Sequence, residues 1–328
     1  MVLAAGDGTR LARLTTDSDG NAVPKQFCSL QGGASLLQEA IHRARRVAPR
    51  ERICAIVAAQ HLRYWQRSLW MLSSSNMIIQ PANRGTANGV LLSVQSILRR
   101  DPLARIVFLP ADHYVRDERV LGGALREAAT LATRDSDALA LIGLEPEEAD
   151  PGLGYIVPGQ SSVDGSWSVE RFVEKPPLPM ARQLILSGAL WNSFIFAVSA
   201  PALLALMRQR LGSTADDIAR ALALDKRTPG PASALTELYE QLPATYFSRD
   251  VIEGSERFLR VVRAPACGWS DLGTPVRVAE LLRRLHAERA PKLASRPREI
   301  KVPAGSALIN LAAQQARLGL TGYRRVLL

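Results

Sequence analysis

Short apolar runs alternate with longer stretches in which apolar residues recur every three or four positions along the first 145 residues. The runs predict strands at residues 1–5, 53–59, 77–80, 105–109 and 138–144, and the longer stretches predict helices at 35–47, 61–72, 86–100 and 117–133. This alternation is typical of an α/β fold with a mostly parallel, doubly wound (Rossmann-like) sheet. Because such a sheet carries helices on both faces, we expect three layers.

The pattern changes after residue 145. The next strand-like runs lie at 155–157, 168–173 and 191–198, with short connections, and glycine and proline are frequent between 146 and 179. We expect these runs to form an antiparallel insertion on the first sheet. Helical patterns return at 200–211, 215–224 and 233–242, and a strand at 258–263 and a helix at 275–286 follow. Residues 290–298 resemble a basic linker, so we predict one large domain, 1–289, and a short appendage of unknown role, 290–328.

The composition is that of a folded protein without a membrane anchor. The 328 residues are 47% hydrophobic and 22% charged, which suits a large core and argues against disorder. No apolar run is long enough to span a bilayer, and the segment after Met1 lacks the basic and apolar regions of a signal peptide. The three cysteines, Cys28, Cys54 and Cys267, are far apart, so we expect a reduced, cytoplasmic protein without a disulfide framework or zinc site.

The net charge of +10 comes almost entirely from arginine, since the chain has only five lysines. A basic chain can bind nucleic acid, a membrane surface or small anions. Most arginines follow helical stretches such as 41–50 and 276–289, where they indicate solvated helix faces. Only 5% of residues are aromatic and no basic cluster is interleaved with aromatic side chains, which argues against nucleic acid. Small anionic substrates are the partners that we expect.

A glycine-rich turn follows the first expected strand. Glycine at two positions lets the backbone turn tightly and approach a phosphate, while a hydroxyl and a guanidinium supply hydrogen bonds to its oxygens. An ordinary strand-to-loop turn is the alternative explanation. The candidate nucleotide-binding residues of this segment are Leu3, Ala4, Ala5, Gly6, Gly8, Thr9 and Arg10.

A second motif, Pro24-Lys25-Gln26-Phe27, follows about fifteen residues later, and Lys25 can reach the same phosphates as a point charge. Together the two segments resemble the sugar-1-phosphate nucleotidylyltransferases, whose signature is G-x-G-T-R-L followed by P-K. The P-K-Q-F form resembles in particular the bacterial mannose-1-phosphate guanylyltransferases. The resemblance covers about residues 1–285. It implies the fold of nucleotide-diphospho-sugar transferases and makes Arg10 and Lys25 catalytic.

Further segments match this family in order along the chain. By resemblance, the loop over residues 80–87 reads the nucleobase, with candidate contacts at Gln80, Gly85, Thr86 and Ala87. Thr86 can also cap the following helix, which is the structural alternative. The family commonly has asparagine where Gly85 stands, and this departure bears on the choice of base.

Two aspartates are candidate magnesium ligands. Asp112 ends an apolar run, and the carboxyl end of a parallel strand faces the binding crevice. Asp271 lies in Gly268-Trp269-Ser270-Asp271-Leu272-Gly273, which resembles the family's W-x-D-x-G. The resemblance implies that both hold Mg²⁺, a hard ion that suits two carboxylates and substrate phosphates, and it makes Asp112 catalytic. A turn or helix-cap aspartate is the alternative for each. For His113 we favour packing, or support of its neighbours, over a role as catalytic base.

The sugar phosphate is expected to contact a third group of motifs. The segments G-L-G-Y, V-E-K-P and W-N-S-F resemble the family's sugar-side motifs, which makes Gly154, Tyr155, Glu174, Lys175 and Asn192 candidate substrate-binding residues. A surface ion pair before a proline turn is the alternative for Glu174 and Lys175. The family's glycine after W-N-S is Phe194 here. Asp250 matches a family position only loosely and receives at most a supporting role.

The resemblance implies transfer of a nucleotidyl group from GTP to mannose 1-phosphate, giving GDP-mannose and pyrophosphate. Another nucleotide or sugar, such as a glucose-type substrate, stays open, as does a catalytically silent regulatory relative that binds sugar nucleotides. Arg10, Lys25, Asp112 and Asp271 occurring together argue against silence. The first strand contains Met1, where the family has several more residues, and the tail does not resemble an isomerase-type extension. The sequence leaves a homodimer open.

Overall fold

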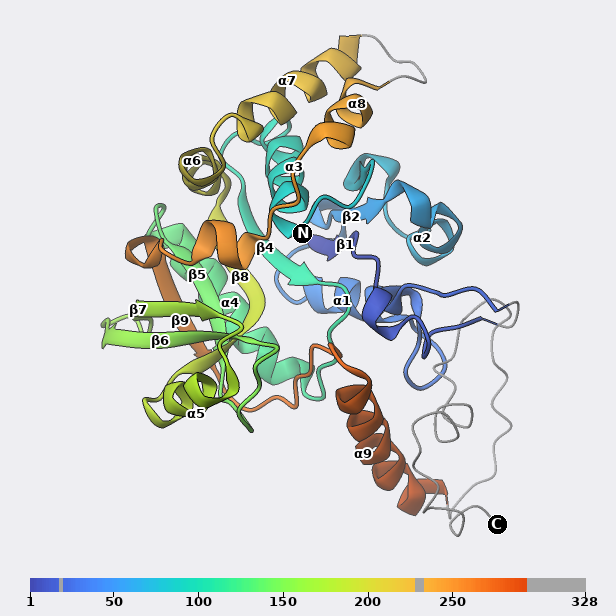
Figure 1. The fold of residues 1–328 in the computed structure, drawn as a ribbon, viewed down its shortest axis with the longest axis vertical. Helices are drawn as coiled ribbons and strands as arrows, with labels where there is room; N and C mark the ends of the chain where they lie inside the picture. The colour runs from blue at the N-terminus through green and yellow to red at the C-terminus, as the bar shows by residue number, and fades with distance from the viewer. Residues whose placement is uncertain (18–19, 228–232, 294–328) are drawn as a thin grey trace.

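Nine strands form a single sheet in the computed structural model, which describes residues 1–17, 20–227 and 233–293. The strand order is β3-β2-β1-β4-β8-β5-β9-β7-β6, and β6 also pairs with β8 (Figure 1). The strands are β1 Val2–Ala4, β2 Ala55–Ala58, β3 Met77–Gln80, β4 Arg105–Pro110, β5 Leu139–Leu144, β6 Gly154–Ser161, β7 Trp167–Glu174, β8 Leu190–Ser199 and β9 Leu259–Ala264.

The sheet is mixed. The pairs β1–β2, β1–β4, β2–β3 and β5–β9 are parallel, whereas β4–β8, β5–β8, β6–β7, β6–β8 and β7–β9 are antiparallel. The prediction of a mostly parallel sheet therefore holds for the strands up to residue 110, whereas among the later strands only the pair β5–β9 is parallel. The antiparallel insertion is confirmed, but its strands extend the same sheet and place β8 at its centre.

Helices cover both faces of the sheet, as predicted. They are α1 Leu36–Ala44, α2 Leu62–Ser68, α3 Thr86–Leu98, α4 Glu118–Arg134, α5 Leu178–Leu186, α6 Ala200–Leu211, α7 Thr214–Arg227, α8 Ala234–Gln241 and α9 Pro275–Leu293. One core lies under α1, α2, α4, α5 and α9, and a second under α3, α6, α7 and α8. Alternate residues of one strand point to opposite faces, so Ala140 joins the first core and Leu141 the second.

Several helices differ from the prediction. The helix α5 was not predicted, because its proline-rich start resembles a loop, although proline is tolerated in the first turn of a helix. The helix α2 ends at Ser68 instead of continuing to residue 72. The helix α9 runs to Leu293, so the linker expected from residue 290 cannot start there. Most of the predicted appendage lies outside the described residues, and the division into 1–289 and 290–328 stays a prediction.

Within the described ranges, no helix combines the length and apolar character needed to cross a bilayer. The cytoplasmic location and the homodimer stay predictions.

Candidate active site

The two N-terminal motifs lie against each other. Gly8 has a left-handed backbone, with φ of 65°, and a Cβ atom at this position would lie 3.1 Å from the backbone nitrogen of Lys25. The buried Gln26 donates from Nε2 to the carbonyl oxygens of Ala4, at 3.0 Å, and Gly6, at 2.7 Å. A larger residue at position 8 would therefore be strained, and Gln26, which sequence analysis did not assign to the site, holds the glycine-rich loop against residues 24–27.

The cation of this loop points to solvent. Thr9 and Arg10 begin a short 3-10 helix directly after Gly8, and both are exposed. No hydrogen bond or ion pair joins the Arg10 guanidinium to another part of the described chain. Arg10 is thus available to an anion that approaches the loop, and its role in binding and catalysis stays a prediction.

Asp7 links this loop to the ends of two neighbouring strands. Its carboxylate accepts hydrogen bonds from Gln60 Nε2, at 3.0 Å, and Asn83 Nδ2, at 2.8 Å. Asn83 Oδ1 in turn accepts from the backbone N–H of Gly85, at 3.0 Å. The loops after β1, β2 and β3 are therefore tied together by side chains that the motif analysis did not assign.

The loop expected to read the base is shaped by close backbone packing. Gly85 has φ of 82°, and a Cβ atom there would overlap the carbonyl oxygen of Thr245. Thr86 Oγ1 accepts a hydrogen bond from the backbone N–H of Phe247, at 2.8 Å. The helix α3 has Gly85 at its N-cap without a side-chain cap, so the reading of Thr86 as a helix cap is wrong.

The other two candidates of this loop face inward. Gln80 is buried and donates from Nε2 to the carbonyl of Ala82, at 2.6 Å. Ala87 is buried, and its N–H donates to Thr245 O at 3.1 Å. Their side chains shape the loop, so any contact with a base would come from exposed backbone or from residues 83–86.

The segments that contain Asp112 and Asp271 lie side by side. Tyr114 and Ser270 form an antiparallel bridge, in which each N–H donates to the other's carbonyl at 2.9 Å. Two aspartates that are 159 positions apart are thereby brought to the same end of the sheet, as the resemblance implied.

Lys25 lies between these two segments. Its ammonium is 3.1 Å from Asp112 Oδ2 and donates to the carbonyl oxygens of Asp271, at 2.8 Å, and Leu272, at 3.2 Å. The lysine side chain is only 11% exposed, which limits the screening of these contacts by water. Leu272 adopts a left-handed backbone, with φ of 50°, and this turn directs both carbonyls to the same cation.

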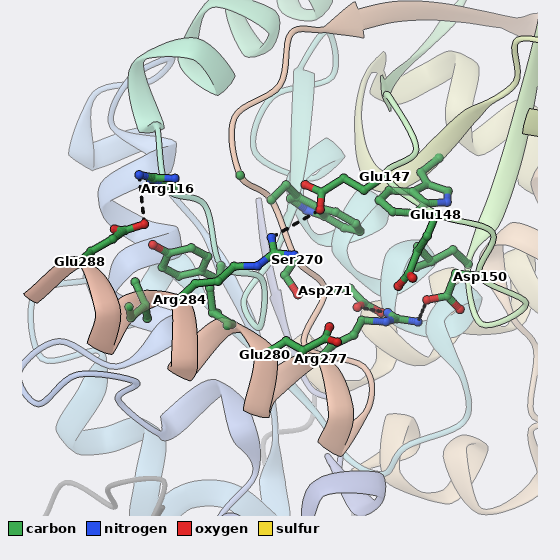
Figure 2. Close-up of a pocket in the computed structure, with 17 residues that line it drawn as sticks. Arg116, Glu147, Glu148, Asp150, Ser270, Asp271, Arg277, Glu280, Arg284 and Glu288 are labelled. Atoms are coloured by element: carbon green, nitrogen blue, oxygen red, sulfur yellow. Dashed lines mark hydrogen bonds and ion pairs between the residues drawn. The ribbon is translucent and has the colours of Figure 1, made fainter. Parts of the chain in front are cut away.

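The Asp271 carboxylate is held by one of its oxygens. Oδ1 accepts from the N–H of Gly273, at 3.0 Å, and from the guanidinium of Arg277, which also pairs with Asp150 (Figure 2). Burial disfavours the charged form, but Arg277, together with His113 and Lys25, outweighs this and lowers the pKa of Asp271 below its usual value. Oδ2 receives no donor from the described residues.

His113 supports the adjacent aspartate. Its Nδ1 accepts a hydrogen bond from the indole N–H of Trp269, at 3.2 Å, and Nε2 lies 3.8 Å from Asp112 Oδ1. Burial lowers the pKa of His113 to about 4, so the ring is neutral near pH 7. These contacts agree with the expected supporting role and give Trp269 a function that sequence analysis did not assign.

The sugar-side motifs also meet. Gly154 lies opposite Glu174 in the β6–β7 pairing, and a Cβ on Gly154 would come within 2.7 Å of Glu174 Oε2 and 3.3 Å of Asn192. Lys175 pairs with Glu174 at 2.8 Å while its side chain remains 54% exposed. The structure thus brings these candidates together, and the ion pair named as their alternative is present as well.

Tyr155 has a different place from the one expected. Its side chain is fully buried, and the hydroxyl donates to Asp150 O, at 3.1 Å, and accepts from Asp150 N, at 2.8 Å. The buried tyrosine therefore holds the backbone of the loop at Asp150, and its side chain does not face a substrate.

Backbone strain is concentrated beside the same motifs. Lys175, Phe194 and Leu272 have φ of 50°, 57° and 50°, and no other non-glycine residue of the described chain has a left-handed backbone. Each follows a candidate residue by one or two positions. Such conformations cost about 1–3 kcal/mol and tend to occur at functional sites. The Phe194 ring packs edge-on against the Phe247 ring, with the ring centroids 5.9 Å apart.

Asp271 lines a cavity of about 260 Å³, which lies between α9 and the segments 147–153 and 268–271. Figure 2 shows charged side chains around it, with Arg277 directed at Asp271 and Asp150, Arg284 at Glu147, and Arg116 at Glu288.

The sequence is similar to a known family and to named proteins. A family model described as nucleotidyl transferase matches residues 1–288. The mannose-1-phosphate guanylyltransferase of Salmonella muenchen is 31% identical over 289 residues, covering 84% of this chain and 57% of that protein. The xanthan biosynthesis protein XanB of Xanthomonas campestris pv. campestris (strain B100) is 31% identical over 280 residues, with the same coverage. The chain spans a little over half the length of these curated relatives.

Solved structures agree with the fold. The crystal structure of a mannose-1-phosphate geranyltransferase from Thermus thermophilus matches with a TM-score of 0.70 at 30% identity, covering 83% of this chain and 75% of that one. A UDP-glucose pyrophosphorylase complexed with UDP-glucose matches with a TM-score of 0.57 at 14% identity, covering 88% of this chain and 98% of that one. The second likeness concerns the fold alone. Together with the family match, these findings confirm the resemblance seen in the sequence motifs.

Proposed function

The chain belongs to the nucleotidyl transferase family, and from this premise we propose that it transfers the guanylyl group of GTP to mannose 1-phosphate, giving GDP-mannose and pyrophosphate. The position of Lys25 carries the proposal. Its ammonium contacts Asp112 and the carbonyls of Asp271 and Leu272, so the glycine-rich loop and both aspartate segments meet at one point.

The chemistry requires positioning and charge neutralisation more than proton transfer. A phosphate oxygen of the sugar phosphate, ionised near neutral pH, attacks the α-phosphorus of the nucleotide. The bond from this phosphorus to the oxygen of the β-phosphate breaks, and pyrophosphate leaves with the electron pair. Arg10 and Lys25 would hold the triphosphate and stabilise the charge that develops.

The residues present fit a divalent metal. Asp112 is about a third exposed, and Asp271 keeps Oδ2 without a donor among the described residues because Arg277 and Gly273 hold Oδ1. Carboxylate oxygens suit Mg²⁺, which takes its remaining ligands from phosphates and water. We therefore assign Asp112 and Asp271 as its protein ligands. When bound, the metal would reduce the repulsion between the two anionic substrates.

The sugar phosphate would lie against the strands β6, β7 and β8. The carboxylate of Glu174 can accept from two sugar hydroxyls, and Asn192 can donate to another. Lys175 would contact the phosphate, which requires its exposed ammonium to share or leave the ion pair with Glu174. Gly154 allows the close approach of this loop to Glu174 and Asn192.

The guanine base would contact the loop of residues 80–87. The backbone at Gly85 and Thr86 is fixed by its packing on residues 245–247 and by the Asp7–Asn83 link. Such a fixed backbone can present hydrogen-bonding groups to one base in preference to another. The choice of GTP and mannose 1-phosphate over other pairs is supported by the names of the relatives.

Pyrophosphate release tests the proposal. GTP, UTP, ATP, CTP and dTTP are each offered with mannose 1-phosphate and with glucose 1-phosphate in the presence of Mg²⁺. We expect release with GTP and mannose 1-phosphate. Release only with another pair would overturn the substrate assignment and leave the chemistry, whereas a folded protein that releases none would be a silent relative.

A further inference from the structure

Arg277 joins two acidic residues that line the cavity. Figure 2 shows its guanidinium between Asp150 and Asp271, and both ion pairs are present in the structure. The side chains of Arg277, Asp150 and Asp271 are only 15%, 16% and 18% exposed, so solvent screens the pairs weakly. The planar guanidinium presents a fork of donors in a fixed geometry that suits two carboxylates, whereas a lysine ammonium is a compact point charge on a flexible stem.

One end of this bridge is fixed to the sugar-side loop. Asp150 Oδ1 accepts from the N–H of Gly152 at 2.7 Å, and the Asp150 backbone is held from both sides by the hydroxyl of Tyr155. The loop leads into β6 at Gly154, which lies opposite Glu174. Any displacement of Asp150 would therefore reach the candidate sugar-binding residues.

The other end of the bridge is fixed to the catalytic lysine. Asp271 is held at Oδ1 by Arg277, and its own carbonyl receives the Lys25 ammonium, which in turn lies against Asp112. A series of contacts thus runs from Asp150 through Arg277 and Asp271 to Lys25 and Asp112, in which the step from Asp271 to Lys25 is made by the backbone carbonyl.

Stabilisation of α9 does not account for this placement. Arg277 is the third residue of α9, and the helix has no acidic residue in its first turn. A cation near a helix N-terminus is unfavourable because the helix dipole is positive there. The helix by itself therefore gains nothing from this cation, and the contacts that hold Arg277 lie outside the helix, at Asp150 and Asp271.

We infer that Arg277 is a positioning residue, which couples the loop of residues 150–155 to Lys25 so that the sugar phosphate and the triphosphate are held in register. This inference rests on the proposed function. Arg277 touches no substrate in this scheme, and it acts through Asp150 and Asp271.

Kinetics of four variants test the coupling. Arg277→Lys keeps the charge but loses the planar fork that holds both carboxylates, and Asp150→Asn keeps the acceptor for Gly152 but weakens the ion pair. We expect each to lower kcat/KM for the sugar phosphate by about 10- to 100-fold, with KM for the nucleotide changed less than about twofold. Because both act through one contact, Asp150→Asn/Arg277→Lys should lose no more than the worse single variant. Arg284→Lys, which alters an exposed pair on the same helix, should match the wild type.

Hydrogen exchange provides a readout that does not depend on activity. Asp150→Asn should speed amide exchange in residues 150–155. It should also speed exchange around Lys25, at the other end of the series of contacts that begins at Asp150. Arg284→Lys should change neither region. Any of three results would overturn the inference. They are amide exchange that changes only near the substitution, single variants with the kcat/KM of the wild type, and losses of kcat/KM that multiply in the double variant.

Failure of the inference is distinct from failure of the proposed function. The wild type tests the function, and the ratio of each variant to the wild type tests the coupling with whichever substrate pair the wild type uses. A wild type without turnover would overturn the function, and the exchange experiment would then decide the coupling by itself.

Discussion

The two sides of the candidate site are built differently. We call residues 5–10, 24–27 and 80–87 the nucleotide side, and residues 150–155, 174–175, 192–194 and 269–273 the sugar side. On the nucleotide side, two left-handed positions are the glycines Gly8 and Gly85, and amide side chains such as Gln26 tie the loops together. On the sugar side, three left-handed positions carry larger side chains, and the charges lie in ion pairs.

This difference suggests how each side meets its ligand. The nucleotide side has little backbone strain to release, and Arg10 is exposed without an ion-pair partner in the described chain, so an anion can bind without breaking an existing contact. On the sugar side, Glu174 and Lys175 neutralise each other before any substrate arrives. Binding there must rearrange contacts, so we expect this side to control specificity and register.

Lys25 lies on the nucleotide side and contacts Asp271 and Leu272 of the sugar side, so its removal should have the largest effect. Lys25→Ala should lower kcat by about 10²- to 10³-fold, because a charge aimed at the developing negative charge is lost. Turnover assays with purified protein measure this loss, and circular dichroism checks the fold. Activity close to the wild type would remove Lys25 from the site and leave the two sides without a common cation.

Gly85 tests whether the nucleotide side depends on close packing. Gly85→Ala should lower the free energy of unfolding by about 2–3 kcal/mol, since the new Cβ overlaps the Thr245 carbonyl and the backbone is left-handed. KM for GTP should rise while KM for the sugar phosphate stays constant. Chemical denaturation and steady-state kinetics measure both.

Gly123→Ala is the matched control for this change. Gly123 lies in α4, and a Cβ there meets no atom within 4 Å. The control should be neutral or more stable by up to about 1 kcal/mol, because alanine favours the helix. A Gly85→Ala variant as stable as this control would mean that the loop can move away from residue 245.

His61 makes the nucleotide side sensitive to acid. The ring is buried, its Nε2 lies 3.7 Å from Asp7, and burial lowers the pKa of His61 below the ordinary value. Below pH 6.5 the unfolded chain therefore binds more protons than the folded one. The contribution of His61 to the stability of the folded state is therefore full above pH 6.5 and falls as the pH drops below it, by less than about 1.4 kcal/mol per pH unit.

The comparison variant for this prediction is His61→Gln, which cannot titrate. Its free energy of unfolding should decline less than that of the wild type between pH 6.5 and 5 in denaturant titrations. Equal declines would show that the acid sensitivity arises elsewhere.

The sequence was informative where the chemistry depends on short motifs and local backbone. The segments around Gly8, Lys25 and Asp112 could be placed because a glycine turn, a proline-lysine pair and a strand-ending carboxylate are local patterns. Most strands were predicted within one or two residues, except that β6 runs four residues further. Helix α5 was missed because two prolines before it and one in its first turn resemble a loop.

The contacts of single side chains could not be predicted in the same way. Arg277 and Asp150 are 127 residues apart, and their pairing depends on how α9 lies against the loop before β6. Tyr155 was expected to face a substrate, but its register in β6 turns the ring into the core. Both outcomes depend on how one element packs against another, which no short sequence pattern indicates.

The strain on the sugar side gives the smallest and most selective prediction. Lys175 is left-handed, so Lys175→Gly should relieve about 1 kcal/mol of backbone strain, partly offset by the greater freedom of glycine in the unfolded chain. We expect a net gain in stability of about 0.5 kcal/mol together with weaker binding of the sugar phosphate. Lys175→Ala loses the same ammonium but keeps the strain, so it should bind as weakly without the gain. Thermal unfolding of the two variants separates strain from charge, and equal melting temperatures would mean that the left-handed turn at Lys175 costs the fold nothing.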